Sequence, residues 1–183
     1  MKQRLTFLVD MFTKSVMRTR TVHAILLFIF AALTGLILHG DRIHYALKSA
    51  PIYEQISRLP HYVVYFAMII LGTTIVVLSW LSAVNVVNTG IDDNMAHVRS
   101  IMLLLSISFI VYSALYFVVP TISHVISEVV LFVSLFLFLL GTKKFSAVRA
   151  AGTILMWHIF VLLYGAIFSM FVVLPIMKLA LLG

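Results

Sequence analysis

Histidine and glutamate supply the chemistry that this sequence could perform within a membrane. His158 lies deep in the longest apolar stretch, residues 150–182, and Glu128 is the carboxylate that falls inside another apolar run. An ionisable side chain at membrane depth is costly, so such a group ordinarily faces the interior of a helical bundle or a cavity. On a helix, His158 shares its side with small residues such as Gly165, against which another helix or a flat cofactor could lie closely. The sequence therefore predicts that His158 faces the inside of the bundle or a cavity.

The composition places these groups in an integral membrane protein. Of 183 residues, 63% are hydrophobic and 10% are charged, and the mean hydropathy is +1.15. A soluble domain has about 25% charged residues, so no soluble domain of useful size is expected. The absence of cysteine excludes disulfides, thiolate metal sites and iron–sulfur ligation in this chain, and it leaves haem held by histidine open. The net charge of +7 indicates contact with lipid headgroups rather than with nucleic acid.

The apolar runs predict an all-α fold, in which residues 1–183 form a single membrane domain. Residues 1–20 are basic and amphipathic, which predicts a helix lying in the membrane interface; no small-residue cleavage site follows it, so we expect it to be retained. Five transmembrane helices are predicted at about 23–39, 61–86, 100–119, 123–140 and 150–182. Lys and Arg gather in residues 1–20 and 141–149. This bias predicts a cytoplasmic N-terminus and an outer C-terminus, in a bacterial inner membrane.

Under this topology the histidines fall into two layers. The outer layer, near the predicted loop 40–60 and the starts of the second and fourth helices, contains His39, His44, His61 and His124. The inner layer, on the first and last helices, contains His23 and His158. His97 falls in a predicted cytoplasmic loop, where we expect it to be solvated.

Two layers of facing histidines are the arrangement that a transmembrane haem b protein needs. Each low-spin haem takes neutral imidazoles from two helices. His61 and His124 are the better axial pair, and His61 shares its helix face with Gly72, where a porphyrin could approach the backbone. His23 and His158 are a second pair, which would need a tilted or deeper first helix. A simpler interpretation stays open: histidines at helix ends keep their polar tips among headgroups, and His158 could hydrogen-bond to another helix.

Glu128 lies four residues beyond His124, on the same face of a helix. One role for it is proton uptake beside a quinone, since a buried carboxylate can pair with a neighbouring histidine. Another is a ligand in an outer-face zinc or copper site. That site would use the nitrogen and oxygen donors predicted at this face: His39, His44, His61, His124 and Glu128. The third interpretation is a structural charge pair with Arg58 or Arg42.

Three short motifs resemble a known family. They are Arg20-Thr-Val-His23, Leu33-Thr34-Gly35 and Arg58-Leu-Pro-His61. The pattern resembles the dihaem cytochrome b subunits of membrane-bound nickel–iron hydrogenases and formate dehydrogenases. The resemblance implies haem b, exchange of electrons with a quinone pool, and a partner subunit outside the bilayer, with His23, His61 and His124 matching in order. The fourth predicted helix departs from the family, because Phe138 stands near the place of its second histidine and His158 would have to replace it.

Three functions follow from these residues. The first is a membrane anchor with haem b that passes electrons between the quinone pool and a partner, at most an electron-transfer subunit of an oxidoreductase complex. The second is a cofactor-free accessory or assembly subunit of a larger membrane complex. It accounts for the lack of a nucleophile–base pair, a P-loop or Rossmann glycines. The third is an outer-face protein that handles metal or other ions.

Overall fold

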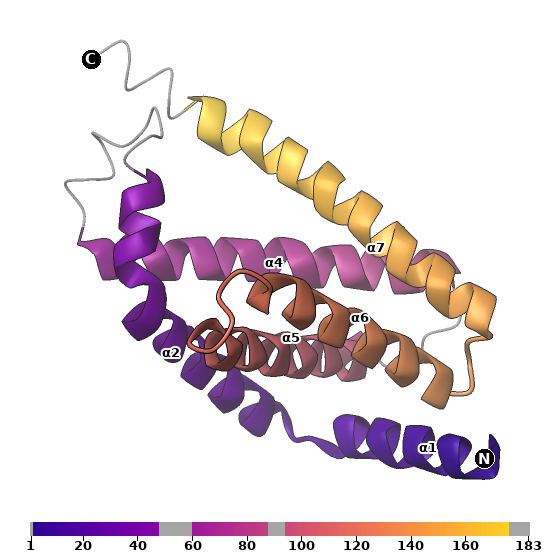
Figure 1. Cartoon of the computed structure of the whole chain (residues 1–183). Helices are drawn as coiled ribbons and strands as arrows, with labels where there is room; N and C mark the ends of the chain where they lie inside the picture. The colour runs from indigo at the N-terminus through magenta and orange to yellow at the C-terminus, as the bar shows by residue number, and fades with distance from the viewer. Residues whose placement is uncertain (1, 48–59, 88–93, 176–183) are drawn as a thin grey trace.

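The computed structural model describes residues 2–47, 60–87 and 94–175, without the side chains of residues 2–5, 36, 39–47, 61 and 173. Within this part the chain forms six α-helices and no strand (Figure 1). The helices are α1 (Lys2–Arg18), α2 (Thr21–Leu47), α4 (His61–Val87), α5 (Asn94–Tyr116), α6 (Ser123–Gly141) and α7 (Ala147–Phe168), the last continued by a π-helical turn, η1 (Ser169–Val173).

Four of the helices are long and apolar enough to cross a bilayer. Their spanning segments are Tyr62–Val87, Asn94–Tyr116, Ser123–Gly141 and Ala147–Val172. Thr6–Arg18 and Thr21–Gly35 meet the same criterion only when taken together, and they are bent by 92° at the break between them, as in a broken span or a re-entrant loop. The predicted all-α membrane bundle is therefore confirmed, with four to five helices that can span. The basic N-terminal segment forms a separate helix, α1, as predicted.

Two helices extend further than the hydropathy pattern predicted. α2 continues to Leu47, through the segment expected to begin a loop at residue 40. Gly40 lowers helix stability by about 1 kcal/mol but does not end a helix, and the next proline is Pro51. At 1.5 Å per residue the 27-residue α2 is about 40 Å long. The hydrocarbon core of a bilayer is about 30 Å thick, so the polar turns of α2 extend out of the hydrocarbon.

The early start of α5 at Asn94 overturns the expectation for His97. We expected a solvated loop residue, but His97 is 6% exposed. Its ring packs edge-on against Phe138 of α6, with 5.9 Å between ring centroids. The expectation was wrong because helical structure begins before the apolar run does, and the added turns carry His97 onto the face of α5 that contacts α6.

Hydrogen bonds between helices join three neighbouring pairs of helices in the bundle. Lipid is as apolar as the helix surfaces, so association in a membrane depends on close packing and on such bonds. The donors and acceptors are Tyr65 Oη to the Ala32 carbonyl (2.9 Å), Ser108 Oγ to the Ser127 carbonyl (2.7 Å), Trp157 Nε1 to the Val76 carbonyl (3.2 Å), and the hydroxyls of Ser82 and Tyr164 (2.7 Å). They link α4 to α2, α5 to α6 and α7 to α4. The most buried large side chains, Trp80 and Phe138, lie among these helices.

α1 lies against the end of the bundle where α6 runs into α7 (Figure 1). Lys143 Nζ lies 3.3 Å from Asp10 Oδ2. Gly141 permits the contact, because a Cβ at this position would collide with the side chain of Thr13 and approach the backbone of Val9. Residues 1–20 and 141–149, the basic segments predicted to share one side of the membrane, therefore meet at one end of the molecule.

Candidate functional site

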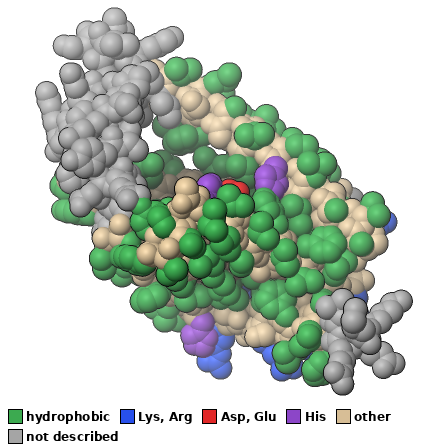
Figure 2. Space-filling model, viewed as in Figure 1, with side chains coloured by type: hydrophobic (Ala, Val, Ile, Leu, Met, Phe, Trp, Pro, Cys, Tyr) green, Lys and Arg blue, Asp and Glu red, His purple; other side chains and the backbone are tan. Residues whose placement is uncertain are grey.

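A row of three exposed polar side chains and one partly buried ring follows the line along which α6 contacts α7. It contains His124, Glu128, Phe132 and His158, and we call it the polar seam. His124 Nε2 lies 3.3 Å from Glu128 Oε1, with 73% and 53% of the two side chains exposed. Phe132 follows Glu128 by four residues on α6, and its ring centroid lies 5.0 Å from that of His158 on α7. In Figure 2 histidine and acidic side chains gather on this face, surrounded by hydrophobic atoms.

The orientation of His158 follows from that of the residue before it. Trp157 is 5% exposed, meets Trp80 edge-on at 5.9 Å between centroids, and donates its indole N–H to the Val76 carbonyl. Successive residues on an α-helix are about 100° apart, so burial of Trp157 turns His158 outward. The prediction that His158 faces the inside of the bundle is therefore wrong for the single chain, where His158 is exposed.

The hydrogen bond of His158 stays within its own helix. Nδ1 lies 2.7 Å from the carbonyl oxygen of Ile154, one turn earlier. A neutral imidazole whose Nδ1 donates to this carbonyl leaves Nε2 as an acceptor on the outside of α7. The cross-helix hydrogen bond considered from the sequence does not form at this nitrogen.

The polar seam extends from one end of the bundle to the middle of a span. His124 lies in the first turn of α6, and Glu128 is five residues beyond Ser123. His158 is eleven residues beyond Ala147, the first residue of α7. At 1.5 Å per residue this is about 16 Å along the axis, close to half of a hydrocarbon core of about 30 Å. An imidazole thus emerges near mid-depth on the outside of the chain.

The predicted outer ligands are only partly within the described part of the chain. The side chains of His39, His44 and His61 lie outside it. α4 begins at His61 and α6 at Ser123; because α5 returns between them, both helices begin at the same end of the bundle (Figure 1). Among the side chains that are described, no three His, Asp or Glu residues converge as metal ligands.

The predicted inner pair is not brought together in this chain. His23 is exposed in the first turn of α2, whereas His158 lies midway along α7. Figure 1 shows α2 and α7 on opposite sides of the molecule, with α4, α5 and α6 between them. A haem bound by both imidazoles of one chain does not fit this arrangement.

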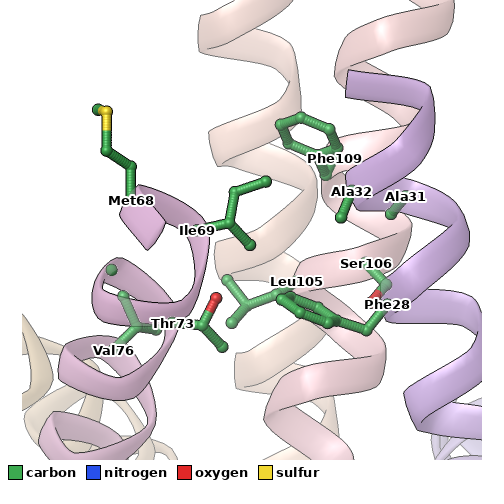
Figure 3. Close-up of a pocket in the computed structure, with 11 residues that line it drawn as sticks. Phe28, Ala31, Ala32, Met68, Ile69, Thr73, Val76, Leu105, Ser106 and Phe109 are labelled. Carbon is green, nitrogen blue, oxygen red and sulfur yellow. The ribbon is translucent and has the colours of Figure 1, made fainter. Parts of the chain in front are cut away.

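A pocket of about 260 Å³ lies among α2, α4 and α5 (Figure 3). Its lining comes from the middle of each helix: Phe28, Ala31, Ala32, Met68, Ile69, Gly72, Thr73, Val76, Leu105, Ser106 and Phe109. Gly72, which we expected to let a porphyrin approach, does border this space. The lining includes neither histidine nor carboxylate, so it offers no axial ligand to an iron.

The polar seam combines two imidazoles, a carboxylate and an aromatic ring on one surface. Phe132, which connects its two halves, was missed from the sequence, although its spacing from His124 and Glu128 repeats every four residues. Such a surface can exchange hydrogen bonds with a partner helix, carry a proton, or present an imidazole to an iron. Neither protein-family models nor comparisons with curated proteins and with solved structures give a match to this chain.

Proposed function

We propose that this protein is a membrane-embedded subunit of a larger membrane complex, in which a partner membrane protein covers the polar seam. The observation that carries the proposal is the exposure of His158 near the middle of a span. Ionisable side chains at this depth face protein or a water-filled cavity, because hydrocarbon cannot satisfy them. A transmembrane helix of the partner, with a hydrogen-bond donor opposite His158 Nε2, supplies this environment.

The surroundings of His158 support a protein neighbour. α7 leaves most of its surface outside the bundle, and Leu162, one turn beyond His158, is 74% exposed. A Cβ added at Gly165 would meet no atom within 4 Å, so the backbone of α7 is open to close approach there. On α6, Glu128 adds a carboxylate that a basic or hydrogen-bonding group of the partner would pair with.

Replacing His158 by leucine tests the proposal. We expect the wild-type protein, extracted from its native membrane in mild detergent, to elute above the mass of the 20.6 kDa chain. His158→Leu should release it as the free chain, because the substitution removes the polar contact but keeps an apolar surface. Light scattering after size-exclusion chromatography measures the mass.

The control is Ile159→Leu, which changes the next exposed residue of α7 without changing its polarity. It should leave the complex intact, and both variants should keep the wild-type helicity and unfolding profile. A wild-type protein that elutes as the free chain, or a complex that withstands His158→Leu, would contradict the proposal.

A second candidate is electron transfer by haem b, with exchange of electrons between a quinone pool and the partner. Two observations favour this candidate: the imidazole of His124 is exposed, and α4 begins with His61 at the same end of the bundle. In this form of the proposal Glu128, 3.3 Å from His124, accepts or releases the proton that accompanies quinone chemistry.

A reduced-minus-oxidised spectrum of the purified complex tests the second candidate. We expect a haem b α-band that His61→Ala and His124→Ala each remove, while Phe117→Leu, a change at an exposed apolar residue, retains it. A colourless complex would end this candidate. Zinc and copper analysis of the colourless protein would then decide whether the outer-face metal site exists.

We also propose that the end carrying α1 and the α6–α7 connection is cytoplasmic, in a bacterial inner membrane. Lys14, Arg18, Lys143, Lys144 and Arg149 lie at this end, and such a concentration of Lys and Arg favours the cytoplasmic side. Because the chain has no cysteine, an impermeant maleimide can report each side. It should label Thr121→Cys in intact cells and Arg149→Cys only after the membrane is opened; the reverse pattern would invert the orientation.

A further inference from the structure

We propose that α1 carries a binding site for the phosphate group of an anionic phospholipid, built around Lys14 and Arg18. A shallow pocket of about 440 Å³ on this helix is lined by Met11, Lys14, Ser15, Arg18 and Thr19. Two cations, two hydroxyl-bearing residues and one apolar side chain thus border one space. This site is separate from the polar seam and does not depend on the proposed partner.

The two cations of the pocket need an anion. Lys14 and Arg18 are four residues apart, so they are neighbours on one side of the helix, where like charges destabilise it. Two carboxylates have described side chains: Asp10 pairs with Lys143, and Glu128 pairs with His124. Asp10 is one turn before Lys14, but neither carboxylate forms an ion pair with Lys14 or Arg18. A phosphate between Lys14 and Arg18 would convert their repulsion into two charge-assisted contacts.

Hydroxyl groups complete the polar edge of the pocket. Thr19 donates its hydroxyl hydrogen to the Ser15 carbonyl, with 3.1 Å between the oxygens. Ser15 contributes a second hydroxyl next to Lys14, and a hydroxyl can donate to a phosphate oxygen. The pocket therefore offers a phosphate the charged N–H donors of Lys14 and Arg18 and the O–H donor of Ser15, while the Thr19 hydroxyl hydrogen is used within the helix.

The position of α1 favours a lipid over a free ion. One face of the helix is fixed to the bundle, since Thr13 and Val16 are buried and Asp10 pairs with Lys143. The other face exposes the apolar side chains Phe7, Leu8 and Met11 beside the two cations. An amphipathic helix of this kind lies in the interface with its apolar side chains among the acyl chains.

The bend between α1 and α2 sets the depth of the pocket. The two helices meet at 92°, so if α2 crosses the bilayer, α1 lies along its surface. Figure 2 shows Lys and Arg side chains at the lower edge of the molecule, in the region where α1 meets α2. The pocket thus lies at headgroup level, where the phosphate of a lipid is held while its chains contact Leu8 and Met11.

Titration of the full-length protein with phosphatidylglycerol tests this site, with native mass spectrometry to count the bound lipid. Each Lys or Arg near an anionic headgroup changes the binding constant about fivefold, so Lys14→Gln/Arg18→Gln should weaken binding about 25-fold. The conservative pair Lys14→Arg/Arg18→Lys should keep most of it. Phosphatidylcholine, which has no net charge, should bind all variants alike.

The matched control is Lys144→Gln/Arg149→Gln, which removes the same charge from the same end of the bundle. It should leave phosphatidylglycerol binding within about twofold of wild type. Equal weakening in both double variants would show general surface attraction and overturn the site, as would undiminished binding in Lys14→Gln/Arg18→Gln. Displacement of the lipid by millimolar inorganic phosphate would assign the site to the free anion instead.

Discussion

Replacing Trp157 by alanine is expected to lower the free energy of unfolding by about 3–5 kcal/mol. Trp157 connects α7 to the rest of the bundle: its ring meets Trp80 at 5.9 Å and Phe132 at 6.4 Å between centroids, and its N–H donates to the Val76 carbonyl. Removal of the indole leaves a cavity between helices whose association depends on packing. An SDS unfolding titration in mixed micelles, followed by circular dichroism, measures the loss.

A comparison of two tryptophans separates packing from hydrogen bonding. Trp157→Phe removes the bond to Val76, whereas the indole N–H of Trp80 has no hydrogen-bond partner within the described part of the chain. We therefore expect Trp157→Phe to lower stability by about 0.6 kcal/mol more than Trp80→Phe. If Trp157→Ala lowered the free energy of unfolding by less than about 1 kcal/mol, the contacts of Trp157 would not be the main attachment of α7 to the bundle.

The outcome at Trp157 also bears on the polar seam. Burial of Trp157 is what turns His158 outward, so release of this ring removes the constraint on the rotation of α7. Trp157→Ala should consequently weaken assembly of the complex as well as the fold. His158→Leu should weaken assembly alone, which distinguishes the two effects.

Gly35→Ala is expected to lower the free energy of unfolding by about 1–3 kcal/mol. A Cβ at Gly35 would overlap the hydroxyl of Tyr65 and the ring of Phe109. Tyr65 is 4% exposed and its hydroxyl is held by the Ala32 carbonyl at 2.9 Å, so the ring cannot turn away without losing this bond. α2 must therefore move away from α4 and α5, and the same SDS titration will detect the loss.

Gly72→Ala is the matched control for this prediction. A Cβ at Gly72 would meet nothing within 4 Å, because the residue borders the pocket among α2, α4 and α5. Alanine is the better helix former by about 1 kcal/mol, so Gly72→Ala should leave stability unchanged or raise it. Equal losses at Gly35 and Gly72 would mean that helix propensity, rather than close approach, governs both positions.

Helix positions were predictable to different degrees at their centres and at their ends. The centres follow from apolar runs, because a backbone in lipid must satisfy its own hydrogen bonds and a helix does so. The ends of α2 at Leu47 and of α5 at Asn94 lie in polar sequence, where hydropathy no longer reports helical structure. Because the first turns of α5 were not predicted, His97 was expected in a loop.

The sequence predicted which residues belong to the candidate site better than it predicted how they are oriented. The pairing of His124 with Glu128 could be anticipated, since four residues on one helix fix both side chains locally. His158 could not be oriented, because α7 is apolar all round and its sequence does not mark which side is inside. The packing of Trp157 against α4 makes that choice.

The sequence by itself determined that this is a helical membrane protein, where its apolar helices lie, and which imidazoles and carboxylates enter them. Those properties depend on composition and on local spacing, which the chain carries without reference to its fold. Only the tertiary structure decided that His97 is buried, that His158 is exposed beside Phe132, and that Lys14 and Arg18 border an outer pocket of α1. Each of these depends on the rotation of one helix against another, which is set by the contacts of large side chains from distant parts of the sequence.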